Sequence, residues 1–388
     1  MYSIQTLNKI SAKGLDRMDR ENYEIASELT QPDAILVRSM KLHDMDFPAS
    51  VKAIGRAGAG VNNIPLDKCS EKGIVVFNTP GANANSVKEL VLAALLVSSR
   101  DIIGGVNWIQ GEADKGDEVP KIVEKGKSNF AGPEIMGKTL GVIGLGAIGA
   151  LVANAASGLG MNVLGYDPFI SVDAAWGLSR NVTKAISLDQ MLSQCDYISL
   201  HLPLNDKTRG LIGGEKFDVM KDNIRIMNFA RGGLVNNEDL LAQIEKGKVA
   251  AYVTDFPEAE LLGNPKVITV PHLGASSPEA EENCAIMAVD QVKDYLENGN
   301  IVNSVNFPAC SMERAGGQRL IIANKNIPDM MRQFLSVLAD AGINVDDMTN
   351  RHKGDVAYNI IDVPCCGITE DITKKIEAID GVIMTRIL

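Results

Sequence analysis

The chain has 388 residues, 45% of them hydrophobic and 22% charged, which is enough for two or three domains with buried cores. A formal net charge of -11 disfavours nucleic acid and anionic membranes as partners, since both repel an acidic surface. The cysteines show neither a disulfide framework nor metal-ligand spacing, and the adjacent Cys365 and Cys366 are interpreted as a coincidence of packing. We therefore predict a cytoplasmic protein without a metal site and without a membrane span.

The first hundred residues alternate between short apolar runs and amphipathic stretches. The runs at 34–37, 51–54 and 74–77 predict strands, and a helix is predicted at 87–99. Residues 111–137 are polar and charged, and we interpret them as a loop-rich surface excursion. Strands that alternate with helices imply a parallel sheet covered on both faces.

A second series of alternating elements follows this excursion. Strands are predicted near 140–144, 162–166, 197–200, 225–229, 250–254 and 267–270, and helices near 147–158, 188–194, 238–246 and 278–297. Gly299 is a natural C-cap for the last of these helices. The fold class expected from both series is α/β, with two doubly wound parallel-sheet domains.

The pattern changes after Pro308. Strands near 319–323, 345–349, 356–363 and 382–387 and helices near 328–341 and 370–379 give the order βαββαβ, the ferredoxin-like plan. We predict three domains: residues 1–90 with 276–305 as an outer substrate-binding domain, residues 91–275 as the nucleotide-binding domain, and residues 317–388 as a separate domain.

A dinucleotide-binding motif begins the second series. Glycines at 144, 146 and 149 follow a strand pattern and open an alanine-rich helix, whose first amides at Ala147 and Ile148 are predicted to face the phosphates. In the order 144, 146, 149, the glycines allow a tight turn, close approach of a pyrophosphate, and helix–strand packing. Asp167 ends the next strand, where a carboxylate grips ribose hydroxyls and repels a 2′-phosphate. The motif therefore favours NAD over NADP.

Three later segments, at 228–233, 254–260 and 271–275, place polar side chains at predicted strand ends. Ligands bind at the carboxyl ends of strands in such sheets, so we expect Arg231, Glu260 and His272 to converge beside the nicotinamide. Oxidation of a hydroxyl group by hydride transfer needs a base, and His272 suits this role near neutral pH. Glu260 is predicted to orient the imidazole, and Arg231 to bind a substrate carboxylate.

These segments, together with residues 55–60 and 78–81, resemble the D-2-hydroxyacid dehydrogenase family, whose members carry an Arg, Glu and His triad. The likeness is greatest to the branch that acts on 3-phosphoglycerate. It implies a Rossmann NAD domain and oxidation of 3-phospho-D-glycerate to 3-phosphohydroxypyruvate at the start of L-serine biosynthesis. The alternatives are a hydroxypyruvate or glyoxylate reductase or another D-2-hydroxyacid dehydrogenase, and, in a different class, an NAD-binding regulatory protein.

The resemblance leaves two candidates for the triad acid. Alignment on Asp255, which would then contact the nicotinamide amide, selects Glu260, whereas alignment on Phe256 and Pro257 selects Glu258. We prefer Glu260, because that alignment keeps the spacing from Arg231 to Asp255 without a gap. Leu202 stands where many relatives carry Thr. The further cofactor contacts implied by the family are Thr79, Leu202, Phe229, Ala230 and Gly274.

The outer domain and the C-terminal segment supply the remaining predictions. By similarity, Gly58 and Gly60 offer backbone amides to the substrate carboxylate. Arg38 and Lys41 are candidates for binding its phosphate, and Ser39 is a further candidate for contact with the substrate. Residues 317–388 resemble an ACT domain, a small regulatory fold that pairs across subunits and binds an amino acid. The implied effector is L-serine, with Asn326 and Asn344 as its ligands. The implied assembly is a homodimer or homotetramer.

Overall fold

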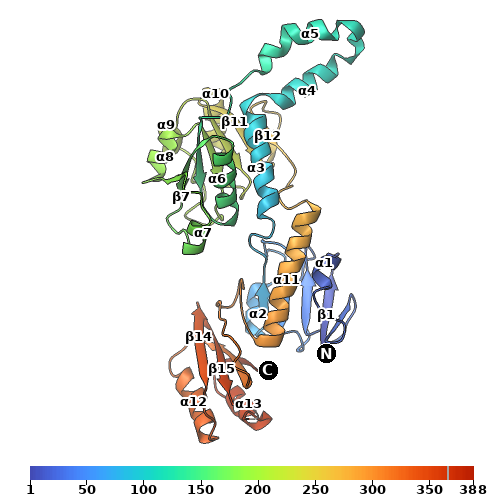
Figure 1. Cartoon of the computed structure of the whole chain (residues 1–388), viewed down its shortest axis with the longest axis vertical. Coiled ribbons are helices and arrows are strands. Elements are labelled where there is room, and N and C mark those ends of the chain that lie inside the picture. The colour runs from blue at the N-terminus through green and yellow to red at the C-terminus, as the bar shows by residue number, and fades with distance from the viewer. Residues whose placement is uncertain (365–366) are drawn as a thin grey trace. The chain divides into compact units, whose positions relative to one another are not determined.

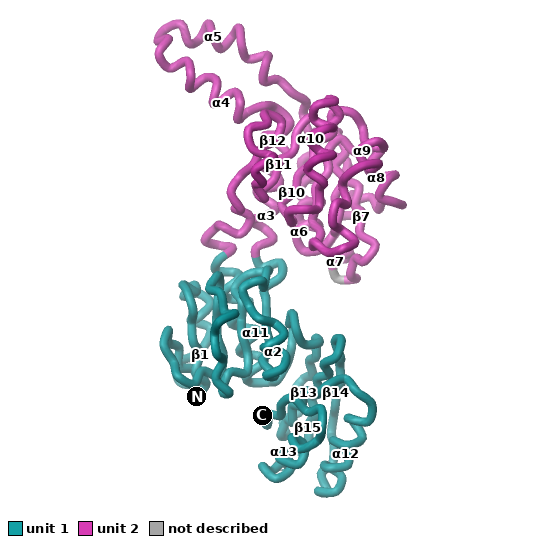
Figure 2. Tube along the Cα trace, turned by 180° about the vertical axis from the view of Figure 1, so that it is seen from behind, with its two compact units in different colours: residues 1–82, 281–388 teal, residues 83–280 magenta. Residues whose placement is uncertain are grey.

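The computed structural model describes residues 1–364 and 367–388, so Cys365 and Cys366, with our interpretation of them, lie outside the described residues. The chain forms two compact units (Figure 2). Unit 1 contains residues 1–82 and 281–388, and unit 2 contains residues 83–280. Within the described ranges, no helix is both long and apolar enough to cross a membrane.

The N-terminal part of unit 1 is a five-stranded sheet of order β2-β1-β3-β4-β5. Every neighbouring pair is parallel, as predicted for this part of the chain. One face of the sheet packs on the buried Ala285, Ala288 and Val292 of the long helix α11. The elements are β1 (Tyr2–Leu7), α1 (Ala12–Leu15), β2 (Tyr23–Ala26), β3 (Ala34–Val37), β4 (Ala53–Arg56), α2 (Leu66–Glu71), β5 (Val75–Phe77) and α11 (Pro278–Asn298).

The C-terminal part of unit 1 is a four-stranded antiparallel sheet of order β14-β15-β13-β16. Its elements follow in the order βαββαβ, as the sequence predicts (Figure 1). Every second residue of β13 faces the two helices. Leu320 and Ile322 on this face pack with Phe334 of α12 and Ile372 of α13. The elements are β13 (Gln318–Lys325), α12 (Met330–Asp340), β14 (Asp347–Lys353), β15 (Val356–Val363), α13 (Glu370–Glu377) and β16 (Val382–Ile387).

The other face of this sheet packs on the end of α11. Ile321 and Tyr358 share a buried cluster with Tyr295. The Tyr358 hydroxyl donates to the Gly299 carbonyl at 2.7 Å, and the Arg386 guanidinium lies 4.8 Å from the Tyr295 ring centroid. Residues 317–388 therefore lie in the same compact unit as the first 82 residues, because their sheet has a second apolar face that α11 covers.

A buried ion pair ties the sheet to the preceding segment. The Arg319 side chain is 0% exposed and binds both carboxylate oxygens of Asp362, at 2.6 and 2.8 Å. Its remaining N–H groups donate to the carbonyls of Asn298, Met312 and Glu313. A buried guanidinium with this many partners repays its desolvation and fixes the path of residues 298–313.

Unit 2 is a seven-stranded parallel sheet of order β12-β11-β10-β9-β6-β7-β8. Helices α3 and α6 cover one face, and α8, α9 and α10 cover the other. The elements of this body are α3 (Ala84–Ser99), β6 (Thr139–Ile143), α6 (Ala147–Gly158), β7 (Asn162–Tyr166), α7 (Val172–Trp176), β8 (Val182–Lys184), α8 (Leu188–Gln194), β9 (Tyr197–Leu200), α9 (Glu215–Val219), β10 (Ile224–Asn228), α10 (Asn237–Glu245), β11 (Val249–Thr254), η3 (Ala259–Leu261) and β12 (Val267–Thr269).

The prediction of a loop-rich segment at 111–137 is wrong. Residues 102–130 form a helical arm that projects from the body of unit 2 (Figure 1). It contains α4 (Ile102–Gly111), η1 (Ala113–Glu118), α5 (Val119–Gly126) and η2 (Lys127–Phe130), closed by the rings of Trp108 and Phe130 at 5.2 Å between centroids. Neither α4 nor α5 has a buried residue, so these helices do not pack against the core of unit 2, and the polar composition of residues 111–137 led to the loop prediction.

Candidate active site

The carboxyl ends of the unit 2 strands gather the predicted cofactor and catalytic residues. The chain runs outward from β6 through β7 and β8, then returns to the other side of β6 with β9 and continues to β12. The reversal between β6 and β9 is the topological switch point at which such sheets bind nucleotides. Arg231, Asp255 and His272 come after the neighbouring strands β10, β11 and β12.

The turn between β6 and α6 has the geometry that its glycines predict. Gly144 has a φ of 89°, and a Cβ there would lie 2.5 Å from the His201 carbonyl oxygen. A Cβ on Gly149 would lie 1.9 Å from the Gly144 carbonyl oxygen, so helix and strand meet more closely than any side chain allows. A Cβ on Gly146 would meet no atom within 4 Å, which leaves space above the helix start.

Asp167 is held beside this turn. Its Oδ2 accepts the N–H of Leu145 at 2.9 Å, and its Oδ1 accepts the N–H of Phe169 at 2.8 Å. The carboxylate is thus fixed at the end of β7, next to the glycine turn. This is the position expected for a group that binds ribose hydroxyls.

His201 and Leu202 follow β9 and form the floor of the turn. The His201 Nε2 shares a hydrogen bond of 2.8 Å with the Ser199 hydroxyl, while its buried Nδ1 has no partner. Burial lowers the pKa of His201 to about 4, so this imidazole is neutral at physiological pH. The Leu202 side chain approaches within 2.9 Å of the point where a Gly144 Cβ would lie, and it therefore lines the cradle with apolar surface.

The turn that presents Arg231 is organised by Asn228 at the end of β10. The Asn228 side chain donates to the Arg231 carbonyl at 2.8 Å and accepts the N–H of Ala230 at 3.2 Å. Thr254 donates its hydroxyl to the Asn228 carbonyl at 2.9 Å. Phe229 and Ala230 are buried in this turn, whereas Arg231 is exposed.

Asp255 is buried between the turns that carry Arg231 and His272. It is 1% exposed, and its Oδ1 has no hydrogen-bond partner. Burial raises the pKa of Asp255, while the nearby His272, the Gly274 amide and Arg231 lower it. The His272 ring stands edge-on to Phe256 at 4.9 Å between ring centroids, so the residue after Asp255 packs on the imidazole.

The two candidate glutamates form their side-chain hydrogen bonds with Asn237. Glu258 and Glu260 are exposed on η3 and the residue before it. The Asn237 side-chain amide donates to both, at 3.0 Å to Glu258 and 2.7 Å to Glu260. The structure brings Arg231, Asp255 and His272 to one edge but leaves both glutamates on Asn237.

A comparison with protein families identifies this part of the chain. Residues 92–274 match the family described as D-isomer specific 2-hydroxyacid dehydrogenase, NAD binding domain. Unit 2 is similar to this family over most of its length. The glycine turn and the switch point are therefore parts of an NAD-binding domain.

Individual relatives agree with the family assignment. A D-3-phosphoglycerate dehydrogenase of Methanocaldococcus jannaschii is 34% identical over 331 residues, which cover 83% of this chain but only 60% of that relative. The NAD+-bound 3-phosphoglycerate dehydrogenase of Entamoeba histolytica has a TM-score of 0.59 at 26% identity, with 79% of this chain and 98% of that chain covered. A glyoxylate reductase of Paecilomyes thermophila has a TM-score of 0.63 at 26% identity, with coverages of 78% and 98%.

The residues of the NAD-binding domain fit the cofactor. The open space at Gly146 and the first amides of α6, at Ala147 and Ile148, suit a pyrophosphate at a helix N-terminus. The fixed carboxylate of Asp167 suits a ribose diol. The buried oxygen of Asp255 that lacks a partner suits a donor such as a carboxamide.

The candidate residues of unit 1 follow β3, β4 and β5. Gly58 has a φ of 149°, a backbone conformation that favours glycine. Thr79 donates its N–H to the Gly58 carbonyl at 3.1 Å, and its buried hydroxyl has no partner. Ser39 donates its N–H to the Asn8 side chain at 3.1 Å.

The two cations predicted to bind a phosphate differ in their contacts. Arg38 forms an ion pair with Glu281 at 2.8 Å, and both side chains are roughly two-fifths exposed. Lys41 is exposed. A phosphate at Arg38 would therefore compete with the Glu281 carboxylate, which the sequence did not indicate.

Asn326 and Asn344 lie on the two loops that flank α12. The Asn326 side chain donates to the Gly354 carbonyl at 3.2 Å, and Asn344 donates to Asp346 at 3.1 Å. Each side-chain amide thus donates a hydrogen bond to a nearby residue of the same C-terminal sheet region. Asp329, which starts α12 at a φ of 73°, pairs with Arg332.

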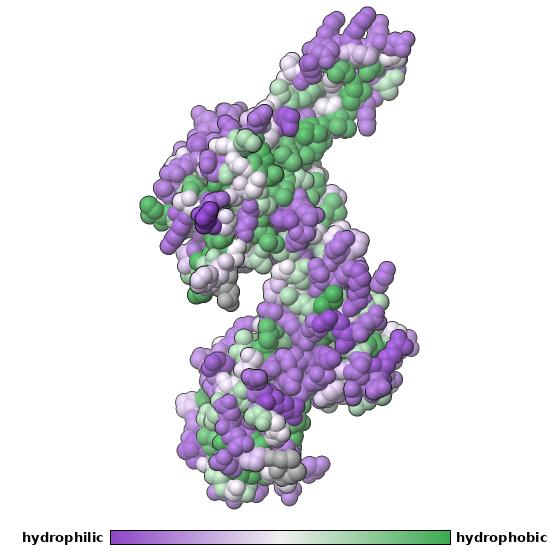
Figure 3. All heavy atoms as spheres, in the orientation of Figure 1, coloured by the Kyte–Doolittle hydropathy of each residue, from purple (hydrophilic) through white to green (hydrophobic). Residues whose placement is uncertain are grey.

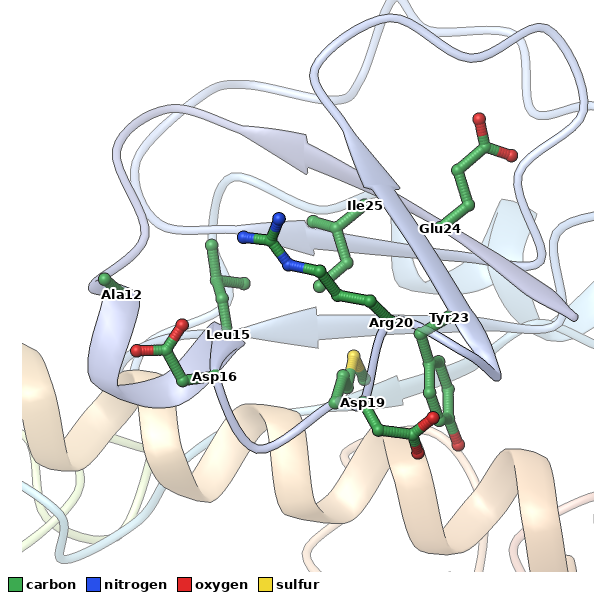
Figure 4. A pocket seen from close by; sticks show the side chains of 9 residues that line it. Ala12, Leu15, Asp16, Asp19, Arg20, Tyr23, Glu24 and Ile25 are labelled. Atoms are coloured by element: carbon green, nitrogen blue, oxygen red, sulfur yellow. The ribbon is translucent and has the colours of Figure 1, made fainter.

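Unit 1 also has a surface hollow of about 610 Å³ along α1 and β2 (Figure 4). Arg20 stretches across it toward Leu15 and Ile25, and the carboxylates of Asp16 and Glu24 lie at its rim. It contains none of the predicted site residues. We assign it no part in the chemistry.

Sequence reasoning missed Asn237 and Glu281 and did not single out the role of Asn228. Asn228 carried a signal, because a polar residue at the end of a buried strand and before Arg231 needs a partner. Asn237 and Glu281 carried none, since each meets its partners only through the tertiary fold.

Proposed function

We propose that this chain is an NAD-dependent dehydrogenase that oxidises 3-phospho-D-glycerate to 3-phosphohydroxypyruvate. The observation that supports this most is the arrival of Arg231, Asp255 and His272 at the ends of three neighbouring strands of the family's NAD-binding domain. The names of the Methanocaldococcus and Entamoeba relatives support the phosphorylated substrate.

The chemistry requires two transfers from the substrate carbinol. Bound NAD supplies a hydride acceptor, which takes the hydrogen and its electron pair from the C–H bond. His272 accepts the hydroxyl proton as the carbonyl forms, since a neutral imidazole is a suitable base near neutral pH. Arg231 binds the substrate carboxylate and holds the reacting carbon in place. Glu260 is the predicted partner of His272.

Unit 1 supplies the proposed groups for substrate selection. Arg38 is the candidate for the phosphate, with Ser39 beside it, and Gly58 and Gly60 are candidates for the carboxylate. These assignments are supported by the positions of the four residues after β3 and β4. On a chain of net charge -11, one exposed guanidinium provides a local attraction for a polyanion.

The decisive experiment compares initial rates of NADH oxidation with phosphohydroxypyruvate and with hydroxypyruvate at equal concentration. We expect a large preference for the phosphorylated compound, with Arg38→Gln removing most of it. Equal rates would instead favour a hydroxypyruvate or glyoxylate reductase, the activity named for the Paecilomyes structure. NADH binding without turnover of any 2-keto acid would favour an NAD-binding regulatory protein.

The C-terminal sheet is proposed to be an ACT-type regulatory domain that binds L-serine. The βαββαβ order and the antiparallel sheet support this, as do the exposed amides of Asn326 and Asn344 on the loops flanking α12. Calorimetry should detect heat on addition of L-serine, and Asn326→Ala should abolish it. Absence of heat with the unchanged chain would leave the domain with a structural role.

The helical arm supports a proposal that the chain forms a homodimer or homotetramer. Ile102, Ile103 and Val106 of α4 are 41% to 46% exposed, and Figure 3 shows apolar side chains along one side of the arm. A surface of this kind usually meets another protein. Light scattering should give more than one chain per particle, and Ile103→Glu with Val106→Glu should lower that number.

A further inference from the structure

The loop after β4 is held in place by the segment after β5. The loop carries Gly58 and Gly60, the candidate ligands of the substrate carboxylate. The Asn78 side chain donates to the Ala59 carbonyl at 2.7 Å, and the Thr79 backbone N–H donates to the Gly58 carbonyl at 3.1 Å. Two neighbouring carbonyls of the loop are therefore bound by two neighbouring residues of one other segment.

These bonds also fix the direction of an N–H group of the loop. A trans peptide unit is planar, and its C=O and N–H point in opposite directions. The Ala59 carbonyl shares its peptide unit with the Gly60 N–H, so the bond from Asn78 turns that N–H away from the Asn78 side chain. The segment after β5 thus determines where the amide proposed for the substrate carboxylate points.

The segment after β5 is itself anchored to α11. Gln291 of this helix is 9% exposed and donates its side-chain amide to the Asn78 backbone carbonyl at 3.0 Å. Strand β4 also meets α11 closely, since a Cβ on Gly55 would lie 2.8 Å from a methyl group of Val292. The helix therefore contacts both the strand that leads into the loop and the segment that holds the loop.

The Gln291 amide has a cost that packing does not explain. Its Oε1 is buried and has no hydrogen-bond partner within residues 1–364 and 367–388. A buried oxygen without a partner lowers stability, and a methionine would fill a similar volume without that oxygen. The benefit of glutamine at this position is its N–H donor, which binds the Asn78 carbonyl.

We propose that Gln291 is a positioning residue for the substrate carboxylate. It acts through Asn78, whose backbone carbonyl it binds and whose side chain holds the Ala59 carbonyl and, with it, the Gly60 N–H. Gln291 itself does not touch the substrate. This inference rests on the proposed function, in which the loop binds the carboxylate of a 2-hydroxy or 2-keto acid.

The first test replaces Gln291 and follows KM separately from kcat. The carboxylate is bound in the ground state and in the transition state alike, so a misplaced loop weakens both to a similar degree. Gln291→Met should raise the KM for phosphohydroxypyruvate about 3- to 10-fold, as expected for one lost hydrogen bond, and change kcat less than about twofold. The urea midpoint should change little, because the variant also loses the unpartnered oxygen. A lowered urea midpoint with an unchanged KM would overturn the proposal.

Gln5 provides a matched control in the same sheet. Its side-chain amide also donates to a backbone carbonyl, that of Ser27 at 3.1 Å, but Ser27 belongs to neither the loop nor the segment after β5. Gln5→Met should leave KM unchanged, and equal rises in both variants would refute the positioning role. If Gln291→Met does not fold, Gln291→Asn, which is one methylene shorter, gives the same measurement.

A double variant tests the route through Asn78. Asn78→Ala removes the bond to the Ala59 carbonyl and should raise KM at least as much as Gln291→Met. Once the Asn78 side chain is absent, the loss of Gln291 should matter much less. The rise in KM of the double variant should therefore lie well below the product of the two single effects. A rise equal to that product would show that Gln291 does not act through Asn78.

The last test needs no substrate and separates this inference from the proposed function. Thr79 is 0% exposed and its N–H binds the Gly58 carbonyl, so deuterium exchange at this N–H reports on the contact between loop and segment. Mass spectrometry should find faster exchange in the peptide that contains Thr79 in Gln291→Met, and unchanged exchange in Gln5→Met. Unchanged exchange in both variants would sink the positioning role. Faster exchange in a chain that reduces no 2-keto acid would instead refute the proposed function alone.

Discussion

The C-terminal antiparallel sheet and the parallel sheet of unit 2 differ in whether their buried polar groups have partners. In the C-terminal antiparallel sheet, Arg319 pairs with Asp362, and the Asn359 amide donates to Asn324 at 2.8 Å. In the parallel sheet of unit 2, Asp255 and His201 each keep a buried polar atom without a partner. The buried polar side chains of the first sheet bond to one another. The second sheet has buried polar atoms without hydrogen-bond partners at the ends of its strands.

The satisfied groups have a structural role, whereas the unsatisfied groups lie where a ligand could bind. A buried polar group without a partner costs free energy, about 1–3 kcal/mol, unless a ligand supplies the missing partner. The unpartnered atoms of unit 2 lie after β9 and β11, at the edge where parallel sheets of this kind bind nucleotides. The satisfied network of the C-terminal sheet instead fixes strand register and the segment that precedes it.

The largest expected effect tests the chemical side of this comparison. His272→Gln should lower kcat by about 100- to 10,000-fold, because a positioned base is lost. NADH affinity and the unfolding midpoint in urea should stay close to those of the unchanged chain. Turnover within a factor of three of the original would show that another group takes the proton.

The architectural side predicts a loss of stability. Asp362→Ala leaves the buried Arg319 charge without its carboxylate and should lower the free energy of unfolding by about 3–5 kcal/mol. The control is Glu370→Ala, which removes an exposed partner of Lys374 at 3.7 Å and should have no measurable effect. Urea unfolding followed by circular dichroism measures both, and equal effects would contradict the distinction.

Two glycines of the nucleotide turn sharpen the comparison within unit 2. Gly149→Ala places a Cβ 1.9 Å from the Gly144 carbonyl oxygen and should cost about 1–3 kcal/mol of stability. Gly146→Ala meets no atom within 4 Å, so its urea midpoint should stay in place while NADH affinity falls. Unchanged NADH binding in Gly146→Ala would place the pyrophosphate elsewhere.

The smallest expected effect concerns the exposed ion pair of Arg38 and Glu281, which belongs to neither of these two sheets' buried polar groups. Glu281→Gln frees Arg38, and the KM for phosphohydroxypyruvate should fall about two- to threefold, in keeping with the modest strength of exposed pairs. The KM for hydroxypyruvate serves as the control and should not change. A parallel change in both KM values would argue against Arg38 as the phosphate ligand.

Most of the fold could be predicted from the sequence because its elements are locally encoded. The apolar runs predicted three strands of the first parallel sheet and six of the second, but β1, β2 and β8 were missed. The order βαββαβ after Pro308 was also predicted. The arm at 102–130 could not be predicted in the same way. Its helices have no buried residue, and the polar and charged composition of residues 111–137 resembles that of a loop.

The candidate site divides along the same line. Asp167 directly follows β7, and Arg231 and His272 come shortly after β10 and β12. Because strand ends share one edge of a parallel sheet, their spacing in the sequence predicts that these residues lie at one edge. The sequence could not decide which carboxylate is the triad acid, because Asp255, Glu258 and Glu260 lie within six residues of one another. Their spacing predicts a carboxylate near the end of β11, but it does not predict which of the three is buried.

The sequence by itself determined the strand–turn–helix of the nucleotide cradle, since glycine geometry and strand periodicity act over a few residues. Only the tertiary structure decided the electrostatics: it buried Asp255 beneath the turns of Arg231 and His272, and it placed Asn237 against the two glutamates. The reason is physical. Burial and hydrogen bonding depend on what packs from other elements, and no local pattern in the chain records that.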